Sequence, residues 1–461
     1  MLNILLKQLF LEYLINLLKK VNIMGSMIPL KSNDLKEKAD ENLLDWGTKH
    51  KEAKRFRKRN TRETHRTDYR RDKDRILYAK GFRRLQYKTQ VLVNDAGDHH
   101  RTRLTHTLEV QQLSTNIAES LGANKELAEA IALGHDLGHT PFGHAVESVL
   151  NDKLTKFGGF SHAVQSIRYL EHIKYHSNEE KIKEKEGLNL TKQVLEGILK
   201  HDSDILDISF DNEQEYTHQW EKCKRLSPNK PGKLEDQIVY WADKIAYLSH
   251  DWDDFVNYGL KEKYINEGYL SDKEIDEVWE PLINNYQGHD NLELRDIVKN
   301  LTDNLINNTS KRLKELLPSS SQEVVKLTEE KINKIKNNNL NECCAGNELN
   351  NSDILRCALL VNFEDQYRNS LLEARKFLAK KFYGNTTVAR MDQKAKYIVS
   401  RIFDKYVKNP SLLPIKTQQT IKEKHDRFSK ERIIADHIAG MTDRYANKIY
   451  EELFLPGNYY Y

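Results

Sequence analysis

Cysteine is the first residue type that the sequence has little of. Its 461 residues include only four cysteines, Cys223, Cys343, Cys344 and Cys357. Neither their number nor their spacing is that of a zinc ribbon or a disulfide framework. Such cysteine usage fits a reducing compartment, and we expect the protein to be cytoplasmic.

Long apolar runs are also missing. The first 21 residues are rich in Leu and Ile, but Lys7, Glu12 and Lys19 interrupt them before the ~20 apolar residues that span a bilayer. Glu12 also argues against a secretory signal. We expect no membrane partner and interpret this stretch as an amphipathic helix that docks on the domain or on another subunit. If translation starts at Met24 or Met27, it is leader sequence instead.

Neither a charge excess nor a phosphate-binding glycine loop is present. Lys and Arg number 73 against 69 Asp and Glu, a net charge of +4, which is too balanced for a duplex-DNA binder. The basic run Lys51–Arg71 is typical of a solvated arm. Without G-x-G-x-x-G or a P-loop, any nucleotide chemistry must come from side chains and a metal.

What the sequence does have is helical periodicity, with few strand signals. We therefore predict an all-α fold with four parts: an N-terminal amphipathic or flexible extension (1–50), a catalytic domain (51–333), an Asn-rich loop (334–351) and a C-terminal helical region packed on the catalytic domain (352–461). Apolar residues recur at three- and four-residue spacing in Leu108–Leu121, Leu127–Leu133, Val164–Ile173, Ile238–Leu248, Leu371–Phe382 and Ile433–Leu453.

Two histidines and two aspartates point to a metal site. His135 and Asp136 follow an apolar helix, His106 lies one helix earlier, and Asp243 sits inside the apolar helix IVYWADKIAYLSHD. A lone His-Asp pair is more often structural, but a carboxylate within such a helix is costly unless it is paired or metal-bound. Two imidazoles and two carboxylates suit Mn, Fe, Ni or Zn and leave coordination positions open. This pattern favours a hydrolase.

One helix face continues from the predicted metal ligand. Asp243, Tyr247 and Asp251 are four residues apart and so share a face. A metal ligand, a flat apolar ring and an acceptor for a sugar hydroxyl would then stand in line. Core packing for Tyr247, and a surface or capping role for Asp251, are the alternatives.

At these residues the chain resembles the HD-domain metal-dependent phosphohydrolases, most closely their deoxyguanosine triphosphate triphosphohydrolase branch. The resemblance runs from about Lys54 to Pro456. It is carried by RDKDRILYAKGFRRLQYKTQV, RTRLTHTLEV, HDLGHTPFGHAVE, GLNLT, QIVYWADKIAYLSHD and DHIAGMTDRYA. It implies the helical HD fold with additional C-terminal helices, and hydrolysis of deoxynucleoside triphosphates, dGTP favoured, to a deoxynucleoside and inorganic triphosphate.

The resemblance also implies roles for individual residues. A divalent cation, Mn²⁺, Mg²⁺ or another transition metal, would be bound by His106, His135, Asp136 and Asp243. His144 would be the catalytic histidine and Glu147 its carboxylate partner, with His139 and His162 near the phosphates. Substrate would be bound by Gln90, Arg103, Lys200, Lys244, Tyr247 and Asp251.

Partners follow from the same resemblance. We expect a dNTP substrate and a homo-oligomer, from dimer to hexamer, joined partly through Ile433–Leu453. We expect Asp443 and Arg444 to reach either a nucleotide pocket or a subunit interface; the alternative is that they form structural salt bridges. Single-stranded DNA and a nucleotide effector are further candidate partners.

The sequence departs from the usual family pattern at Thr140 and Val146, where Pro and Gly are usual, and at Ser161 and Ala163. Val146 is bulkier than glycine beside the catalytic pair, which bears on base and sugar selectivity. Two alternative functions stay open. One is another HD phosphohydrolase activity, on nucleoside monophosphates, phosphodiesters or alarmones; the other is non-catalytic binding of nucleotides or single-stranded nucleic acid.

Overall fold

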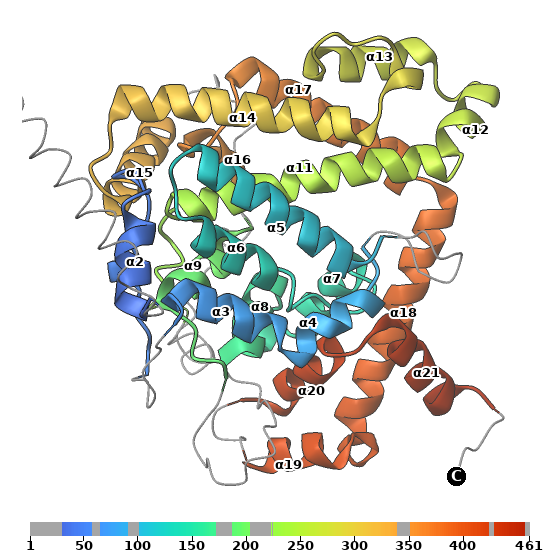
Figure 1. Cartoon of the computed structure of the whole chain (residues 1–461). Coiled ribbons are helices and arrows are strands. Elements are labelled where there is room, and N and C mark those ends of the chain that lie inside the picture. Colours follow the sequence, from blue (N-terminus) through green and yellow to red (C-terminus); the bar gives the residue numbers. More distant parts are fainter. Residues whose placement is uncertain are drawn as a thin grey trace, which may run out of the picture.

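The fold is built almost wholly from α-helices (Figure 1). The computed structural model describes residues 30–57, 65–90, 101–171, 187–202, 223, 225–338, 351–423 and 428–456. Its α-helices are α2 (Ser32–Asp40), α3 (Asp68–Leu77), α4 (Lys80–Arg84), α5 (Arg103–Ser120), α6 (Lys125–Gly134), α7 (His144–Lys153), α8 (His162–Glu171), α9 (Lys192–Lys200), α11 (Leu234–Asn257), α12 (Leu260–Asn266), α13 (Asp272–Trp279), α14 (Leu294–Leu316), α15 (Ser321–Asn338), α16 (Asn351–Ala358), α17 (Asp365–Leu378), α18 (Thr386–Lys408), α19 (Ile415–Glu423), α20 (Lys430–Ala439) and α21 (Asp443–Phe454).

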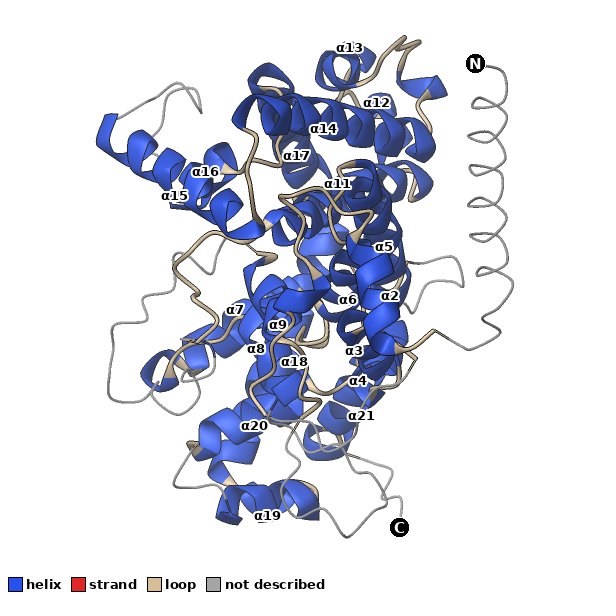
Figure 2. Cartoon of the chain, turned by 60° about the vertical axis from the view of Figure 1, so that its left-hand side comes forward, coloured by secondary structure: helices blue, strands red, loops and turns tan. Residues whose placement is uncertain are grey.

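The all-α prediction is confirmed, because the described residues contain no strand (Figure 2). Only two isolated bridges occur there, between Arg55 and Thr191 and between Thr89 and Thr102. A π-helical turn, η9 (Ala379–Tyr383), continues α17, and six short 3₁₀ turns join other helices: η1 (His50–Glu52), η2 (Leu85–Tyr87), η4 (Thr155–Phe157), η6 (Glu280–Leu282), η7 (His289–Asn291) and η10 (Pro410–Leu412). Within the described part of the chain, no helix combines the length and the apolar character that crossing a membrane requires.

The helices around the site begin at side-chain caps. Thr102 accepts a hydrogen bond from Thr105 N at the start of α5, and Asn124 accepts one from Leu127 N at the start of α6. Thr191 caps α9 in the same way. Because each cap supplies an acceptor to a backbone N–H that has no partner within the helix, it fixes where the helix starts.

The main core surrounds α11, which packs against α5, α6, α9, α14 and α17. Its apolar face, with Ile238, Trp241 and Ile245, is buried among the apolar residues of those helices. The same core takes in Leu371 and Phe382, so residues from both sides of the Asn-rich stretch share it. Burial of this face places Asp243 in the middle of the domain.

A second core holds α7 against the C-terminal helices α18, α20 and α21, in the lower part of Figure 1. Val146 and Leu150 of α7 are buried there with Ile402 and Ile434. The periodic stretch Ile433–Leu453 is two helices, because α20 ends at Gly440 and Thr442 then caps α21. This second core therefore positions the helix that begins at His144.

The predicted divisions of the chain map onto the structure as follows. Residues 1–29 of the N-terminal extension lie outside the described residues. Near the other end of the extension, Trp46 Nε1 donates to Leu121 O, and Thr48 N donates to the Glu235 carboxylate. The first residues of the Asn-rich stretch end α15, and residues 339–350 lie outside the described part. Residues 58–64 of the basic run are also outside it.

Candidate functional site

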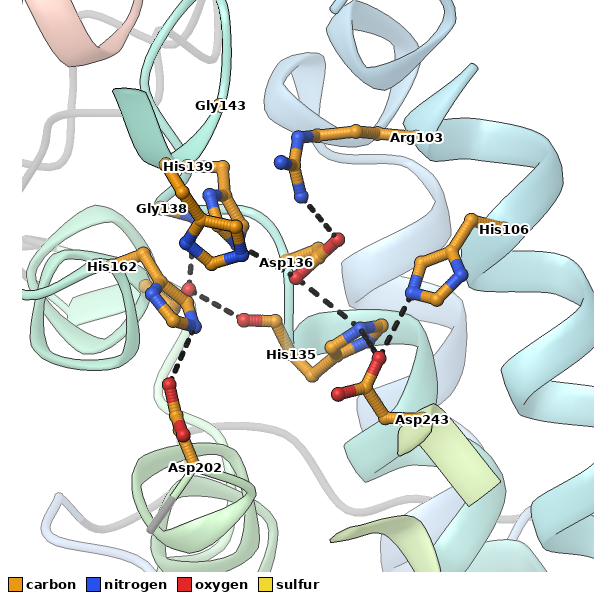
Figure 3. A network of polar contacts seen from close by, with 12 residues as sticks. Arg103, His106, His135, Asp136, Gly138, His139, Gly143, His162, Asp202 and Asp243 are labelled. Carbon is orange, nitrogen blue, oxygen red and sulfur yellow. Dashed lines mark hydrogen bonds and ion pairs between the residues drawn. The ribbon is translucent and has the colours of Figure 1, made fainter. Parts of the chain in front are cut away.

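The four predicted metal ligands converge from two helices and the end of a third (Figure 3). His106 lies on α5, Asp243 on α11, and His135 and Asp136 follow α6. His106 Nε2 is 3.0 Å from Asp243 Oδ1, and His135 Nε2 is 3.7 Å from the same oxygen. His135 Nε2 is also 3.2 Å from Asp136 Oδ1. The predicted constellation is therefore one compact, buried cluster.

The donor atoms suit a divalent cation. His135 Nδ1 lies 2.6 Å from Ala132 O, and a carbonyl oxygen only accepts, so this nitrogen carries the ring proton. His135 Nε2 is buried and has no hydrogen-bond partner among the described residues. A neutral imidazole with its lone pair directed at two carboxylates is the arrangement in which histidine binds a metal. We conclude that the residues present fit the cation.

The carboxylates of the cluster stay ionised. Burial acts to raise the pKa of Asp136, but His135, His139 and Arg103 hold it well below its usual range. For Asp243, burial is likewise outweighed by Lys244 and His106, and its pKa is also well below the ordinary value. Two anionic carboxylates in a buried site favour a bound cation.

A second histidine group adjoins the first, on the α7 and α8 side. Glu147 Oε2 is 3.2 Å from His144 Nδ1, and Glu147 Oε1 is 3.0 Å from His162 Nδ1. His162 and His139 stack with ring centroids 4.0 Å apart. Glu147 is mostly buried, whereas the His144 side chain is 58 % exposed. A carboxylate thus orients two imidazoles, one of which faces the open side.

Charge is tightly coupled in this group. Burial acts to raise the pKa of Glu147, but His162 and His144 hold it well below its usual range. Burial acts to lower the pKa of His162, yet the Glu147 carboxylate raises it to about 9. A cationic imidazole beside an ionised carboxylate is therefore the resting arrangement at neutral pH.

Two glycines allow these groups to approach each other. A Cβ on Gly138 would lie 2.2 Å from Ser166 N and 2.3 Å from His162 O, so α8 can pack this closely only against glycine. Gly143 has φ +65°, and its Cβ would lie 2.8 Å from Arg103 Nη2. These positions bring α8 and the start of α7 against the metal cluster.

The predicted face of α11 is present, with an additional tyrosine that the sequence did not indicate. Lys244 Nζ is 3.1 Å from Asp243 Oδ2. Tyr383, in the π-helical turn η9, donates to Asp251 Oδ1 at 2.9 Å and also bonds the Tyr247 hydroxyl. The Tyr247 and Tyr383 rings are parallel within 3°. No periodic pattern marks Tyr383, because it reaches the site from another helix through a π turn.

The remaining residues that were predicted to bind the substrate are Arg103, Gln90 and Lys200, and their surroundings differ. Arg103 Nη1 is 2.8 Å from Asp136 Oδ2, and Gln90 Oε1 is buried without a hydrogen-bond partner in the described structure. Lys200 instead bonds Glu196 at 2.5 Å and Pro231 O, in a hollow that also includes Tyr240. These contacts give no support to the predicted phosphate role of Lys200.

His201 and Asp202 were not predicted, although a signal existed. They form a second His-Asp pair directly after an apolar helix, as His135 and Asp136 do. His201 Nε2 lies 3.1 Å from His162 Nε2, and Asp202 Oδ2 lies 3.6 Å from the same atom. The ring centroids of His201 and His135 are 5.1 Å apart.

The chain matches two family models. Residues 103–248 match the HD domain, and residues 361–452 match the phosphohydrolase-associated domain. A deoxyguanosinetriphosphate triphosphohydrolase-like protein of Rickettsia rickettsii (strain Iowa) is 35 % identical over 85 % of this chain and 92 % of the relative. A protein of the same description from Geobacter sulfurreducens is 38 % identical over 84 % of this chain and 89 % of the relative.

Proposed function

The chain belongs to the family of deoxyguanosinetriphosphate triphosphohydrolase-like proteins, and on this premise we propose that it hydrolyses deoxynucleoside triphosphates to a deoxynucleoside and inorganic triphosphate. It is an HD-domain phosphohydrolase. The proposal of this specific reaction rests on one observation, which is that three groups of residues lie next to one another. The metal cluster, the His144–Glu147–His162 group and the Tyr247–Tyr383–Asp251 group adjoin one another through Asp136 and α11.

Each group has a distinct part in the proposed reaction. A divalent cation held by His106, His135, Asp136 and Asp243 would lower the pKa of a bound water and polarise a phosphate oxygen. Water attacks the α-phosphorus, and the bond from phosphorus to the 5′-oxygen of the sugar breaks. His144 donates the proton that this leaving oxygen needs, and Glu147 orients its ring.

Phosphate charge is met by Arg103, His162 and Lys244, whereas burial and Arg103 hold the pKa of His139 well below its usual range, so that His139 is a neutral neighbour of the phosphates. Arg103 and Lys244 each pair with a carboxylate of the metal cluster, which places their cationic groups at its edge. His139 and His162 stack on the opposite side of Asp136 from His106 in Figure 3. Fixed positive charge where phosphate charge builds up is typically a large contribution to catalysis.

Selectivity for 2′-deoxynucleotides is the second part of the proposal. Tyr247 would lie flat against the sugar where a 2′-hydroxyl would otherwise sit, and its hydroxyl is held by Tyr383. Gln90 and Asp251 would pair with the 3′-hydroxyl. A dideoxynucleotide would leave both unsatisfied, at about 1 to 3 kcal/mol each. Among bases we propose dGTP, in keeping with the names of the relatives.

Product analysis tests the reaction. The Mn²⁺-loaded protein is incubated with each dNTP, alone and in pairs, and the products are separated by phosphorus NMR and chromatography. We expect inorganic triphosphate and the deoxynucleoside. Pyrophosphate or orthophosphate as the first product would indicate another HD phosphohydrolase activity. No turnover, with single-stranded DNA bound, would indicate a non-catalytic binder.

Sugar selectivity is tested with GTP against dGTP. We expect the wild type to exclude GTP and Tyr247→Ala to admit it. Tyr383→Phe is the matched control, because it keeps a ring in place and removes only the hydroxyl that bonds Tyr247 and Asp251. Equal hydrolysis of GTP and dGTP by the wild type would contradict the steric account.

We further propose that the chain assembles into a homo-oligomer through its C-terminal helices. Tyr397 of α18 is 55 % exposed and lies next to Tyr450 of α21, which leaves aromatic surface on these helices. Light scattering at micromolar concentration tests the assembly. A fully active monomer would contradict it.

A further inference from the structure

A buried histidine beside the metal cluster has no part in the proposed reaction. His250 lies on α11, seven residues after Asp243, and is 2 % exposed. Seven residues are about two helical turns, so His250 and Asp243 share a face of α11. The ring of His250 packs edge-on against that of His106, with ring centroids 5.4 Å apart and planes at 78°. His250 therefore adjoins a predicted metal ligand without belonging to the four predicted ligands.

The two histidines of the metal cluster differ in what holds their second nitrogen. His135 Nδ1 lies 2.6 Å from Ala132 O, which fixes that ring with Nε2 towards the cluster. His106 Nε2 lies 3.0 Å from Asp243 Oδ1, but His106 Nδ1 is buried and has no hydrogen-bond partner among the described residues. When Nε2 of a histidine binds a cation, the proton of the ring is on Nδ1 and needs an acceptor. His106 therefore needs an acceptor that its own helix does not supply.

His250 offers such an acceptor. Its Nε2 contacts the carboxylate of Glu109, which lies on α5 three residues after His106. An ionised carboxylate only accepts, so Nε2 carries the proton of His250, and Nδ1 of the neutral ring carries a lone pair. This Nδ1 is also buried, and the described part of the chain gives it no hydrogen-bond partner. A nitrogen that must donate and a nitrogen that can accept therefore lie on two rings in contact.

Charge holds Glu109 in this arrangement. Its side chain is 41 % exposed, and Arg101 Nε lies 4.0 Å from its Oε1. Arg101 in turn pairs with Asp253 of α11 at 2.6 Å. Burial acts to raise the pKa of Glu109, but His250 and Arg101 hold it below its usual value. The carboxylate is therefore ionised, and it joins α5 to α11 beside the metal cluster.

We propose that His250, held by Glu109, positions the metal ligand His106 by accepting its Nδ1–H, directly or through one water. This bond would hold the ring of His106 with Nε2 towards the cation. His250 is a positioning residue, since it acts through His106. The inference rests on the metal site of the proposed function, and it does not depend on which phosphate compound is hydrolysed.

Manganese affinity measured without nucleotide tests the inference. The full chain is stripped with EDTA and titrated with MnCl₂, and free Mn²⁺ is measured by electron paramagnetic resonance. His250→Phe keeps an aromatic ring against His106 and removes both nitrogens, so we expect the Kd to rise about 10 to 100 fold. His250→Gln removes the ring but keeps a donor for Glu109 and an acceptor for His106, so we expect an affinity close to that of the wild type. A role in packing alone predicts the reverse order.

His289→Phe is the matched control. His289 is also a buried histidine beside an acid, with Nδ1 3.0 Å from Asp276, and its replacement should leave the Kd unchanged. Glu109→Ala decides the matter if His250→Phe does not fold, because Glu109 is partly exposed, and we expect it to weaken Mn²⁺ binding. Wild-type affinity in His250→Phe or Glu109→Ala, or equal losses in His250→Phe and His250→Gln, would overturn the inference.

The same titration separates this inference from the proposed function. Triphosphate release by the wild type, together with an unchanged Kd in His250→Phe, would overturn the inference alone. A wild type that binds Mn²⁺ and releases no triphosphate would overturn only the proposed function. No Mn²⁺ binding by the wild type would overturn both.

Discussion

The two hydrophobic cores of the molecule hold different halves of the same site. The main core around α5, α6 and α11 carries His106, Asp243 and the His135–Asp136 pair, all of them buried. The second core joins α7 to α18, α20 and α21, and carries His144 and Glu147 in the first turn of α7. The residues predicted to bind the metal and the histidine predicted to donate a proton are therefore positioned by packing in separate parts of the fold.

The difference between the two regions lies in how each residue is constrained. The predicted metal ligands are fixed by burial, as the 1 % exposure of His106 indicates. His144 is exposed and takes its position from Glu147 and from the backbone turn before it, where Phe142 and Gly143 both have positive φ. Packing therefore constrains the first group more tightly than the second.

Polar contacts connect the two cores. Asp443 at the start of α21 accepts from Thr89 N at 2.8 Å and from Phe142 N at 2.9 Å. Lys88, wholly buried, donates to the carbonyl oxygens of His139 and Ala439. The C-terminal region thus holds the loop before His144 and the residues just before Gln90.

The largest expected effect comes from Asp136→Ala, which tests the main-core half. Asp136 is a predicted metal ligand and the partner of Arg103 and His139. We expect loss of bound metal and of turnover. Metal content by mass spectrometry, measured together with rates, checks this result. An active variant that still binds metal would contradict the assignment of Asp136 as a metal ligand.

His144→Ala tests the other half. General acid catalysis typically contributes about 10² to 10⁴ fold, so we expect a rate loss of that size with bound metal unchanged. The same two measurements apply. If both variants lose metal equally, then His144 is a ligand and the division between the two cores is wrong.

Asp443→Asn tests the connection between the cores. In asparagine an NH₂ group replaces one of the two carboxylate oxygens of Asp443. The backbone N–H of either Thr89 or Phe142 then loses its acceptor. Leaving such a group unsatisfied costs about 1 to 3 kcal/mol. We expect that loss in the free energy of unfolding, a lower kcat from displaced His144, and unchanged metal content.

Asp404→Asn is the matched control for this variant. Asp404 joins α18 to Lys153 of α7 at 2.7 Å, but its side chain is 57 % exposed and that of Lys153 is 30 % exposed. Surface ion pairs contribute about 0 to 1 kcal/mol. An equal fall in kcat for both variants would contradict a positioning role for Asp443.

The smallest expected effect is on pH dependence in the metal-free protein. Burial lowers the pKa of His162, but Glu147 raises it to about 9, above the unfolded value of 6.5. The stabilisation from this pair is full below pH 6.5 and is lost as the pH rises through about 9. Glu147→Gln should therefore flatten the fall in unfolding free energy across that range. Urea unfolding at several pH values checks the slope, and equal slopes would exclude the ion pair.

Much of the main-core half could be predicted from the sequence. Apolar residues at helical spacing identified α5, α6 and α11, and two acids and two imidazoles in or beside such helices required a shared partner. The confirmed family relationship and all-α fold follow from the same ordered motifs. The residue roles assigned there stay predictions until the variants are measured.

Other contacts of the site could not be predicted, because they join residues that are close only in three dimensions. Tyr383 joins Asp251 through a π turn more than a hundred residues away in sequence. Lys200 and His201 are neighbours, yet adjacent residues on a helix point about 100° apart. The family resemblance points to Lys200, but it is His201 that contacts His162.

Periodicity and residue chemistry alone indicated six amphipathic helical stretches and a buried set of two imidazoles and two carboxylates that suits a divalent cation, since these depend on local spacing and on the cost of burying charge. Tertiary structure alone decided which core carries His144, how Asp443 holds the loop before it, and that two His-Asp pairs meet around Asp136. These last features arise from packing between helices distant in the chain, where the direction of each side chain depends on its neighbours and not on its own sequence.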